Sequence, residues 1–289
     1  MTLSESILAD PVHVEAPDST AGGGPRQQSR RRRTASRLAQ HGVSLRVASV
    51  VILLILWQLL SVVVGERILP APWTTAVALL ELMGESTFWD DFQVTMVRIL
   101  IGFAASMFLG VLLGMTMGLS RIAEGLLDIW VVVGQTIPSL CWVIIAFIMF
   151  GLNDTATVVA VTLTSFPIIA VNMWAGVKAI DPKLGQMART MGASVGLRSR
   201  VVTIPQVMPA VMASARFGFG LVWKVVVLAE LLGRTDGIGY RLNYFYQLFR
   251  MDQVFALTLF FSIFMVLLEL CVFKPIEKRM FRWRPEGIK

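Results

Sequence analysis

Long apolar segments dominate the chain, and short polar segments separate them. Six apolar segments are long enough to cross a bilayer, whose hydrocarbon core needs roughly 20 consecutive apolar residues of helix. Four of them carry no charged residue, the fifth carries Arg216, Lys224 and Glu230, and the sixth carries only Glu269. The pattern predicts an all-α, polytopic membrane protein with six transmembrane helices. The expected spans are Val47–Val64, Ile99–Ser120, Ile129–Asn153, Thr155–Val177, Val201–Leu232 and Val254–Phe273.

A polar stretch follows the fourth apolar segment and carries the signals of a capped helix. Asp181 precedes Pro182, which is typical of a helix start, because an Asp side chain accepts free N–H groups and Pro suits the first helical position. Gly192 predicts the end of this helix, since glycine readily adopts the left-handed conformation that closes a helix.

A second short helix is expected between this one and the fifth apolar segment. Ser194 predicts its N-terminal cap, and we expect it to run to Ile204, with Pro205 opening the fifth segment. A loop that only joined two spans would not need two capped helices. The pattern therefore predicts that the loop 178–205 forms a docking surface.

Small residues recur at intervals of one helical turn within the second apolar segment. In lipid, where dispersion rather than water exclusion drives packing, this spacing lets another helix approach closely. We expect that helix to belong to the same chain. The residues are Gly110, Gly114 and Gly118.

Composition excludes an ordinary water-soluble domain. Hydrophobic residues make up 55% of the 289 residues and charged residues only 16%, which is too little charge to cover a soluble surface. Two cysteines, Cys141 and Cys271, lie in separate spans, and we interpret them as packing residues.

The distribution of Lys and Arg predicts the orientation, because cytoplasmic loops of membrane proteins are enriched in both. Seven lie before Val47, one is Arg121, five lie within residues 178–200, and six lie from Lys274 onward. Both termini and the 178–205 loop are therefore expected in the cytoplasm. Only four lie on the opposite side: Arg67, Arg234, Arg241 and Arg250.

Residues 1–42 form a basic arm rich in Ser, Pro, Gly and Asp, and we expect this arm to be disordered. Its four arginines at 30–33 have the composition of a nucleic-acid or anionic-lipid patch. We interpret them instead as the positive flank that keeps the N-terminus inside, with no nucleic-acid partner. Residues 43–289 are then the transmembrane domain.

Residues with catalytic chemistry are not recognisable in the sequence. It contains no G-x-x-x-x-G-K-[ST] phosphate-binding loop and no cluster of metal ligands. Its two histidines, His13 and His41, both lie in the N-terminal arm. We therefore expect a protein that is not an enzyme, does not hydrolyse ATP itself, and holds no cofactor or metal.

The docking loop resembles a motif of a known family. Residues 186–205, QMARTMGASVGLRSRVVTIP, are similar to the EAA loop of inner-membrane permeases of ABC importers, which reads E-A-A, three residues, G, nine residues, then I-x-L-P. Ala188, Gly192 and Pro205 match this motif. Gln186 stands where the motif has Glu, so it keeps hydrogen bonding but loses the charge.

The resemblance extends over roughly residues 65–284. Five further stretches are similar to the sulfonate, taurine and nitrate branch of these binding-protein-dependent permeases. They are LPAPW (69–73), SRIAEGLLDIW (120–130), TIPSLCWVIIAFIMFGLND (136–154), FPIIAVNMWAGVKAIDPKL (166–184) and WKVVVLAELLGRTDGIGY (223–240).

This resemblance implies the type I permease fold of ABC importers, in the cytoplasmic (inner) membrane of a bacterium. It implies a homodimer of this chain, two cytoplasmic ATPase subunits that bind ATP and Mg²⁺, and an extracytoplasmic substrate-binding protein. The first helix of the docking loop would be a coupling helix that lies in a groove of the ATPase. The coupling residues would be Gln186, Met187, Ala188, Arg189, Gly192, Ile204 and Pro205.

Charged residues inside an apolar span are costly and usually face a cavity or a partner. Arg216, Lys224 and Glu230 lie at different angles around one helix, so each needs a partner elsewhere. Lys224 either has a structural partner or lines a pathway and attracts an anion, and Arg216 either snorkels inward or lines the same pathway. Glu230 is expected to pair with Arg98 or Arg234, as a structural or gating pair. The candidates for the pathway or its gate are Lys224, Arg216, Glu230, Arg98, Trp142 and Trp223.

The leading hypothesis is the permease subunit of an ATP-driven importer for a small anion, such as a sulfonate, taurine, nitrate or a bicarbonate-like solute. Import of an aromatic or vitamin-precursor compound by the same architecture is an alternative. A self-contained secondary transporter or a channel belongs to a different class, although the sequence shows no internal repeat of the kind common in secondary transporters. Docking of an ATPase on residues 181–205 would distinguish an importer from a secondary transporter and from a channel.

Overall fold

The computed structural model describes residue 45 and residues 47–280, so the expected disordered arm at 1–42 lies outside the described residues. Every regular element in the described part is a helix and none is a strand, which confirms the all-α prediction. The chain divides into two compact units, Met1–Leu59 and Leu60–Lys289. The predicted helix Val47–Val64 begins in the first unit and is long and apolar enough to cross a bilayer.

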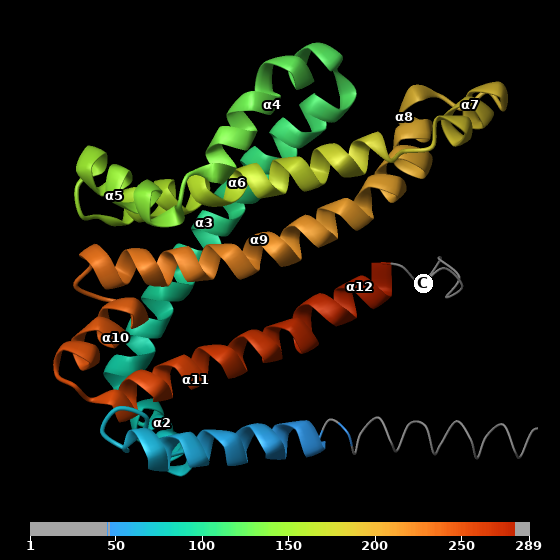
Figure 1. The fold of residues 1–289 in the computed structure, drawn as a ribbon. Coiled ribbons are helices and arrows are strands. Elements are labelled where there is room, and N and C mark those ends of the chain that lie inside the picture. The colour runs from blue at the N-terminus through green and yellow to red at the C-terminus, as the bar shows by residue number, and fades with distance from the viewer. Residues whose placement is uncertain (1–44, 46, 281–289) are drawn as a thin grey trace, which may run out of the picture. The chain divides into compact units, whose positions relative to one another are not determined.

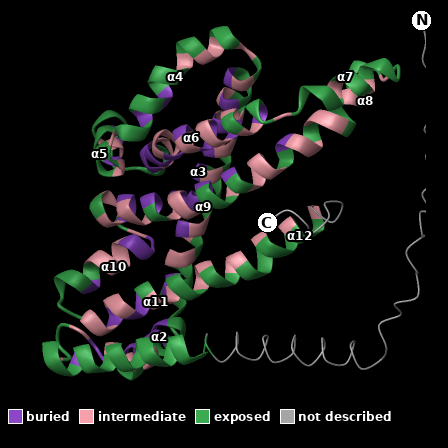
Figure 2. Ribbon diagram, turned by 45° about the vertical axis from the view of Figure 1, so that its right-hand side comes forward, coloured by how far each residue is buried: buried purple, intermediate pink, exposed green. Residues whose placement is uncertain are grey.

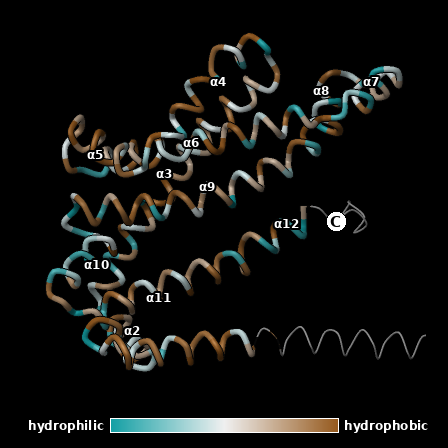
Figure 3. The backbone as a smooth tube through the Cα atoms, viewed as in Figure 1, coloured by the Kyte–Doolittle hydropathy of each residue, from teal (hydrophilic) through white to brown (hydrophobic). Residues whose placement is uncertain are grey.

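The second unit holds the remaining helices, from α2 to α12 (Figure 1). Hydrophilic residues gather at α7 and α8 and near α10, whereas α5 is almost wholly hydrophobic (Figure 3). The bounds are α2 Pro72–Met83, α3 Ser86–Leu119, α4 Arg121–Thr136, α5 Ser139–Phe150, α6 Asp154–Lys178, α7 Pro182–Thr190, α8 Val195–Arg198, η1 Ser199–Thr203, α9 Ile204–Gly233, α10 Ile238–Gln247, α11 Met251–Leu268, η2 Glu269–Phe273 and α12 Lys274–Met280, where η denotes a π-helical turn.

The regularly spaced glycines of the second span let α3 pack closely on α6. Both helices belong to the same chain, as predicted. A Cβ atom added at Gly110 would lie 2.6 Å from the Cβ atom of Ile169, and one added at Gly114 would lie 2.4 Å from the Ala170 carbonyl oxygen. Only glycine therefore fits at these positions. Buried residues are frequent on α3, α6 and α9 (Figure 2), and a further buried apolar cluster joins α2, α10 and α11.

The third expected span, Ile129–Asn153, is not one straight helix. It is divided between α4 and α5, which bend by 97° at a short break containing Ile137 and Pro138. Proline lacks the N–H group that would continue α4, and it disfavours helical dihedrals at the preceding residue. The described residues therefore contain five helices that qualify as membrane spans by length and composition, or six if the bent pair counts as one.

The start and the end of α7 follow the sequence prediction. The Asp181 side chain accepts a hydrogen bond from the backbone N–H of Lys183, at 2.9 Å, and Pro182 is the first helical residue. Gly192 has a φ of 76°, in the left-handed region that closes a helix. The predicted helix signals of the docking loop are therefore confirmed for its first helix.

The second predicted helix of the loop is only partly correct. Ser194 caps α8 as expected, because its hydroxyl oxygen accepts from the Leu197 N–H at 3.3 Å. However, no break follows at Ile204, since α8 continues through the π-helical turn η1 into α9. Pro205 lacks the N–H group that an uninterrupted α-helix would use, and the π-helical turn η1 just before it takes up this irregularity. The second helix of the docking loop is thus continuous with the fifth span.

Candidate functional site

An open cavity lies at the break between α4 and α5. Its volume is about 580 Å³, and its wall comes from the α4–α5 break, α6 and α9. Its lining contains both polar and apolar side chains, including two cations from α9. The lining residues are Gln135, Thr136, Ile137, Pro138, Ser139, Thr164, Ile168, Arg216, Phe217, Gly220, Leu221 and Lys224.

Lys224 is a cation of this cavity that has no partner among residues 47–280. Its side chain is exposed and takes part in no ion pair or hydrogen bond there. The start of α5 meets the same cavity at Ser139, and the first N–H groups of a helix have no partner within it. These groups add positive potential, whereas the last carbonyl groups of α4, at Gln135 and Thr136, line the same cavity and oppose it. The ammonium group of Lys224 is therefore the group that can hold an anion there.

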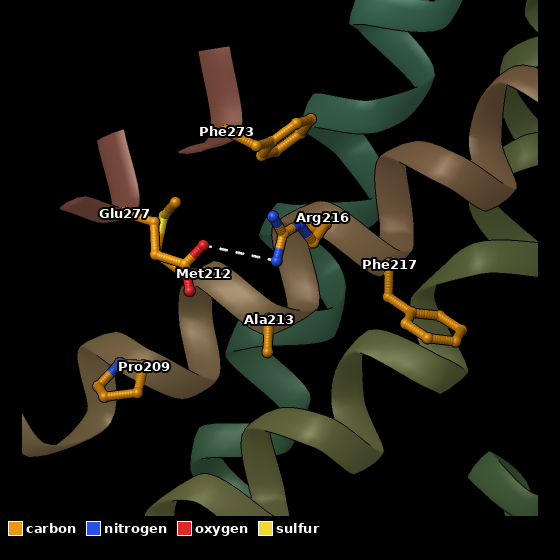
Figure 4. A pocket seen from close by; sticks show the side chains of 7 residues that line it. All are labelled: Pro209, Met212, Ala213, Arg216, Phe217, Phe273 and Glu277. Atoms are coloured by element: carbon orange, nitrogen blue, oxygen red, sulfur yellow. Dashed lines mark ion pairs between the residues drawn. The ribbon is translucent and has the colours of Figure 1, made fainter. Parts of the chain in front are cut away.

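Arg216 lies two helical turns before Lys224 and is already neutralised. It lines both this cavity and a second one of about 340 Å³, where it points toward Glu277 and Phe217 points away (Figure 4). Its Nη1 atom lies 3.5 Å from Glu277 Oε2, and its guanidinium also binds the Glu269 carboxylate. These ion pairs connect α9 to η2 and α12. Arg216 therefore has two carboxylate partners, a pairing that the sequence analysis did not anticipate.

Both candidate tryptophans have packing contacts and do not line the cavity. The Trp142 indole N–H donates to the Gly134 carbonyl oxygen at 3.3 Å, across the break between α4 and α5. The Trp223 ring stacks on Phe261, with 5.2 Å between the ring centroids. Trp142 therefore stabilises the bend that shapes the cavity, and Trp223 belongs to the core between α9 and α11.

A buried ion-pair network joins α3 and α9 near the C-terminal end of α9. The Arg98 side chain is only 3% exposed, and the Glu230 side chain is fully buried. Arg98 Nη1 donates to Glu230 Oε1 at 2.8 Å, so the structure contains one of the two pairs expected for Glu230. Arg98 also donates from Nε to Asp154 and from Nη2 to Asp236, each at 2.7 Å.

The Glu230 carboxylate also holds the loop between α9 and α10. The Thr95 hydroxyl donates to it at 2.9 Å, and the backbone N–H of Gly239 donates at 2.9 Å. A Cβ atom at Gly237, whose φ is 95°, would lie 2.5 Å from the carboxyl carbon. Glycine at this position therefore lets the loop close over the buried charge.

Several members of this network are not predicted by the sequence. Asp154 and Asp236 are two of them, and each binds both Arg98 and Arg234. The two glycines of the stretch DGIGY, at 236–240, are the signal that could have indicated a tight loop. Nothing in the sequence indicates that Asp154, which follows α5, lies beside the end of α9.

The docking loop presents an apolar groove. The groove has a volume of about 300 Å³ between α7 and the η1–α9 junction. On its rim Met187 and Met191 are 60% and 76% exposed, and no residue of α7 is buried. Gln186, Arg189 and Ile204 are also exposed, whereas Ala188 and Pro205 line the groove. Its full lining is Leu184, Met187, Ala188, Met191, Val201, Val202, Pro205 and Gln206.

Comparison with known proteins places the chain among membrane transport components. Residues 106–274 match the family described as the binding-protein-dependent transport system inner membrane component. The chain is 27% identical over 251 residues to the taurine transport system permease protein TauC of Escherichia coli K12, covering 84% of this chain and 91% of the relative. It is 32% identical over 233 residues to the putative aliphatic sulfonates transport permease protein SsuC of the same organism, covering 79% and 88%.

A third relative is named for nitrate import. The nitrate import permease protein NrtB of Synechococcus elongatus is 27% identical over 199 residues, covering 65% of this chain and 71% of the relative. The matched family region begins within α3 and ends at the start of α12. It therefore contains the cavity at the α4–α5 break and the docking loop.

Proposed function

Because this chain belongs to the family of binding-protein-dependent transport system inner membrane components, we propose that it is the membrane-spanning subunit of an ATP-driven importer for a small anion. The negative charge of the solute is inferred from Lys224. Its ammonium group faces the cavity and has no carboxylate partner among the described residues. The relatives are named for taurine, aliphatic sulfonates and nitrate, all of which carry an oxyanion group. An oxyanion of this kind can pair with the Lys224 ammonium group in the cavity.

A second copy of this chain covers the cavity. The cavity is open, and it exposes a lysine together with polar side chains within a segment of apolar spans. Lipid does not solvate such groups, so in a bilayer they face water or protein. Two copies that place their cavities against each other enclose a shared polar pathway, and the apolar surface of α5 remains available for lipid.

The groove at α7 receives a cytoplasmic ATPase. Exposed Met187 and Met191 offer flexible apolar contacts, and exposed Arg189 offers a charge to an acidic partner. ATP and Mg²⁺ bind to that partner, because this chain has no phosphate-binding loop. The enrichment of Lys and Arg near α7 supports a cytoplasmic position for α7, and an extracytoplasmic position for α10 on the side of the binding protein.

Replacing Lys224 by Met is expected to reduce uptake roughly tenfold or more, because the variant loses the charge that attracts the anion. Uptake is measured in proteoliposomes with labelled taurine, an alkanesulfonate, nitrate or bicarbonate, whichever the wild-type complex transports. Lys274, an exposed residue of α12 that lines neither cavity, provides the matched control Lys274→Met.

The control variant should transport at the wild-type rate, and both variants should assemble with the ATPase. Unchanged uptake by Lys224→Met would show that Lys224 is not part of the anion pathway. Loss of assembly would instead show that this lysine has a structural role.

A further inference from the structure

Arg216 is shared by two cavities. It lines the cavity of Lys224 at the α4–α5 break, and it lines the cavity of about 340 Å³ between α9, η2 and α12, which we call the Glu277 cavity (Figure 4). On α9 it comes eight residues before Lys224, or about 12 Å along the helix axis. The start of α9 adjoins the docking loop, so in the proposed orientation Arg216 lies on the cytoplasmic side of Lys224.

The two cavities differ in charge. Among the described residues, the lining of the Lys224 cavity contains two cations and no carboxylate. The Glu277 cavity contains Arg216 and Glu277, and the Glu269 carboxylate binds the same guanidinium group. Two carboxylates therefore face one arginine at the second cavity. The charges of the first cavity attract an anion, whereas those around Arg216 favour its departure.

The Glu269 carboxylate binds Arg216 in the way that an oxyanion can. Arg216 Nε donates to Glu269 Oε2 at 3.1 Å, and Nη2 binds the other oxygen of the same carboxylate. The arginine fork holds phosphate with the same pair of parallel contacts. The contact from Nη1 to Glu277 is 3.5 Å, longer than a usual N–H···O hydrogen bond, so this corner of the guanidinium is held less tightly.

The charged cluster of Arg216, Glu269 and Glu277 is accessible. Their side chains are 41%, 36% and 45% exposed, respectively. Charged groups at membrane depth face water or protein rather than lipid, so water or a solute can reach this cluster. Ion pairs in contact with water are weak, and their partners exchange readily. Glu269 also begins the π-helical turn η2, a type of irregularity that is frequent at functional sites.

We propose that Arg216 is a second anion-binding subsite of the translocation pathway, and that Glu269 and Glu277 compete with the transported anion for its guanidinium group. The anion reaches Arg216 from Lys224, and the two carboxylates then displace it toward the cytoplasm. A site on a pathway must bind an ion well enough to admit it and weakly enough to release it, and the carboxylates meet the second requirement. The proposal rests on the proposed function, which supplies the anion and the direction of transport.

The test uses the complex of this chain with its ATPase and measures two quantities. The first is the Kd of the purified complex, without binding protein, for the labelled anion that the wild type transports, out of taurine, an alkanesulfonate, nitrate and bicarbonate. The second is the maximal rate of uptake in proteoliposomes with binding protein. Glu269→Gln combined with Glu277→Gln is expected to lower the Kd about tenfold, because the released guanidinium group retains the anion. The maximal rate should fall by a similar factor, since the anion leaves more slowly.

Two further variants separate competition for Arg216 from a structural tie between α9 and α12. Adding Arg216→Gln to the double variant should abolish the gain in affinity, because no guanidinium group remains to hold the anion. Glu124→Gln is the matched control, since it breaks the ion pair with Lys178, and neither residue lines the two cavities. It should change the Kd and the maximal rate by less than about 1.5-fold.

A double variant that binds the anion no more tightly than Glu124→Gln would overturn the second subsite. A gain in affinity that persists without Arg216 would overturn it as well, because the gain would have another origin. If the double variant fails to assemble, Glu277→Gln alone decides, since it removes only the longer contact of 3.5 Å. It should lower the Kd about threefold, and an unchanged Kd would overturn the subsite. A wild-type complex that transports no anion would contradict the proposed function itself, which is a different outcome.

Discussion

Replacing Arg98 by Met is expected to lower the free energy of unfolding by about 3–5 kcal/mol, the cost of leaving a buried charge without its partner. The Glu230 side chain is fully buried, and Arg98 is the cation that lies against it. Arg98 also binds Asp154 and Asp236, so its loss releases contacts between α3, α6 and the α9–α10 loop. The measurement is the thermal unfolding midpoint of the purified permease, followed at one detergent concentration.

Two further variants separate the buried charge from other effects of this substitution. Adding Glu230→Gln to Arg98→Met should restore most of the lost stability, because Gln keeps hydrogen-bond capacity toward Thr95 and Gly239 without a charge. Arg121→Met removes an exposed cation at the start of α4 and should change stability by less than about 0.5 kcal/mol. An Arg98→Met protein as stable as Arg121→Met would contradict the view that this network holds the helices together.

Replacing Gly192 by Leu is expected to reduce ATP-driven uptake by about tenfold or more, which corresponds to a loss of ~1.4 kcal/mol in docking free energy. The φ of 76° at Gly192 is unfavourable for a residue with a side chain, so Leu shifts the chain to another conformation. The turn at Gly192 sets the direction of α7 relative to α8, and α8 continues into α9. A changed turn therefore misplaces the proposed docking helix while the membrane spans remain intact.

Gly196 offers a matched control within the same loop. It lies in α8 with an ordinary backbone conformation, and a Cβ atom there would meet no neighbour within 4 Å. Gly196→Leu should therefore keep ATPase assembly and uptake near the wild-type level. Membrane insertion should be normal for both variants, and co-purification of the ATPase reports assembly. Wild-type uptake by Gly192→Leu would count against docking through α7.

Local signals in the sequence predict several elements correctly, because the residues concerned have a single physical role. The cap at Asp181 and the turn at Gly192 are formed as expected, since each depends only on neighbouring backbone groups. The stripe through Gly110 and Gly114 correctly predicts a close helix contact. The spacing alone could not identify α6 as the partner, because any helix can approach a glycine stripe.

Long-range arrangements are less accessible to sequence reasoning. The apolar run Ile129–Asn153 gives no sign of a 97° bend except Pro138, and prolines also occur inside membrane helices, as Pro167 does in α6. The helix α10 lacks a long apolar run, so the hydropathy pattern does not reveal it. The carboxylates that neutralise Arg216 come from the C-terminal helices, more than 50 residues away in the chain. Their sequence positions carry no information about this pairing.

The central claim is that this chain works as the membrane subunit of an ATP-driven importer, with an ATPase on its docking loop. Native mass spectrometry of the complex, gently extracted from its own membranes, tests this most directly. The account predicts an assembly that contains two copies of this chain and two ATPase chains. A stable monomer or homo-oligomer without any nucleotide-binding partner would contradict it.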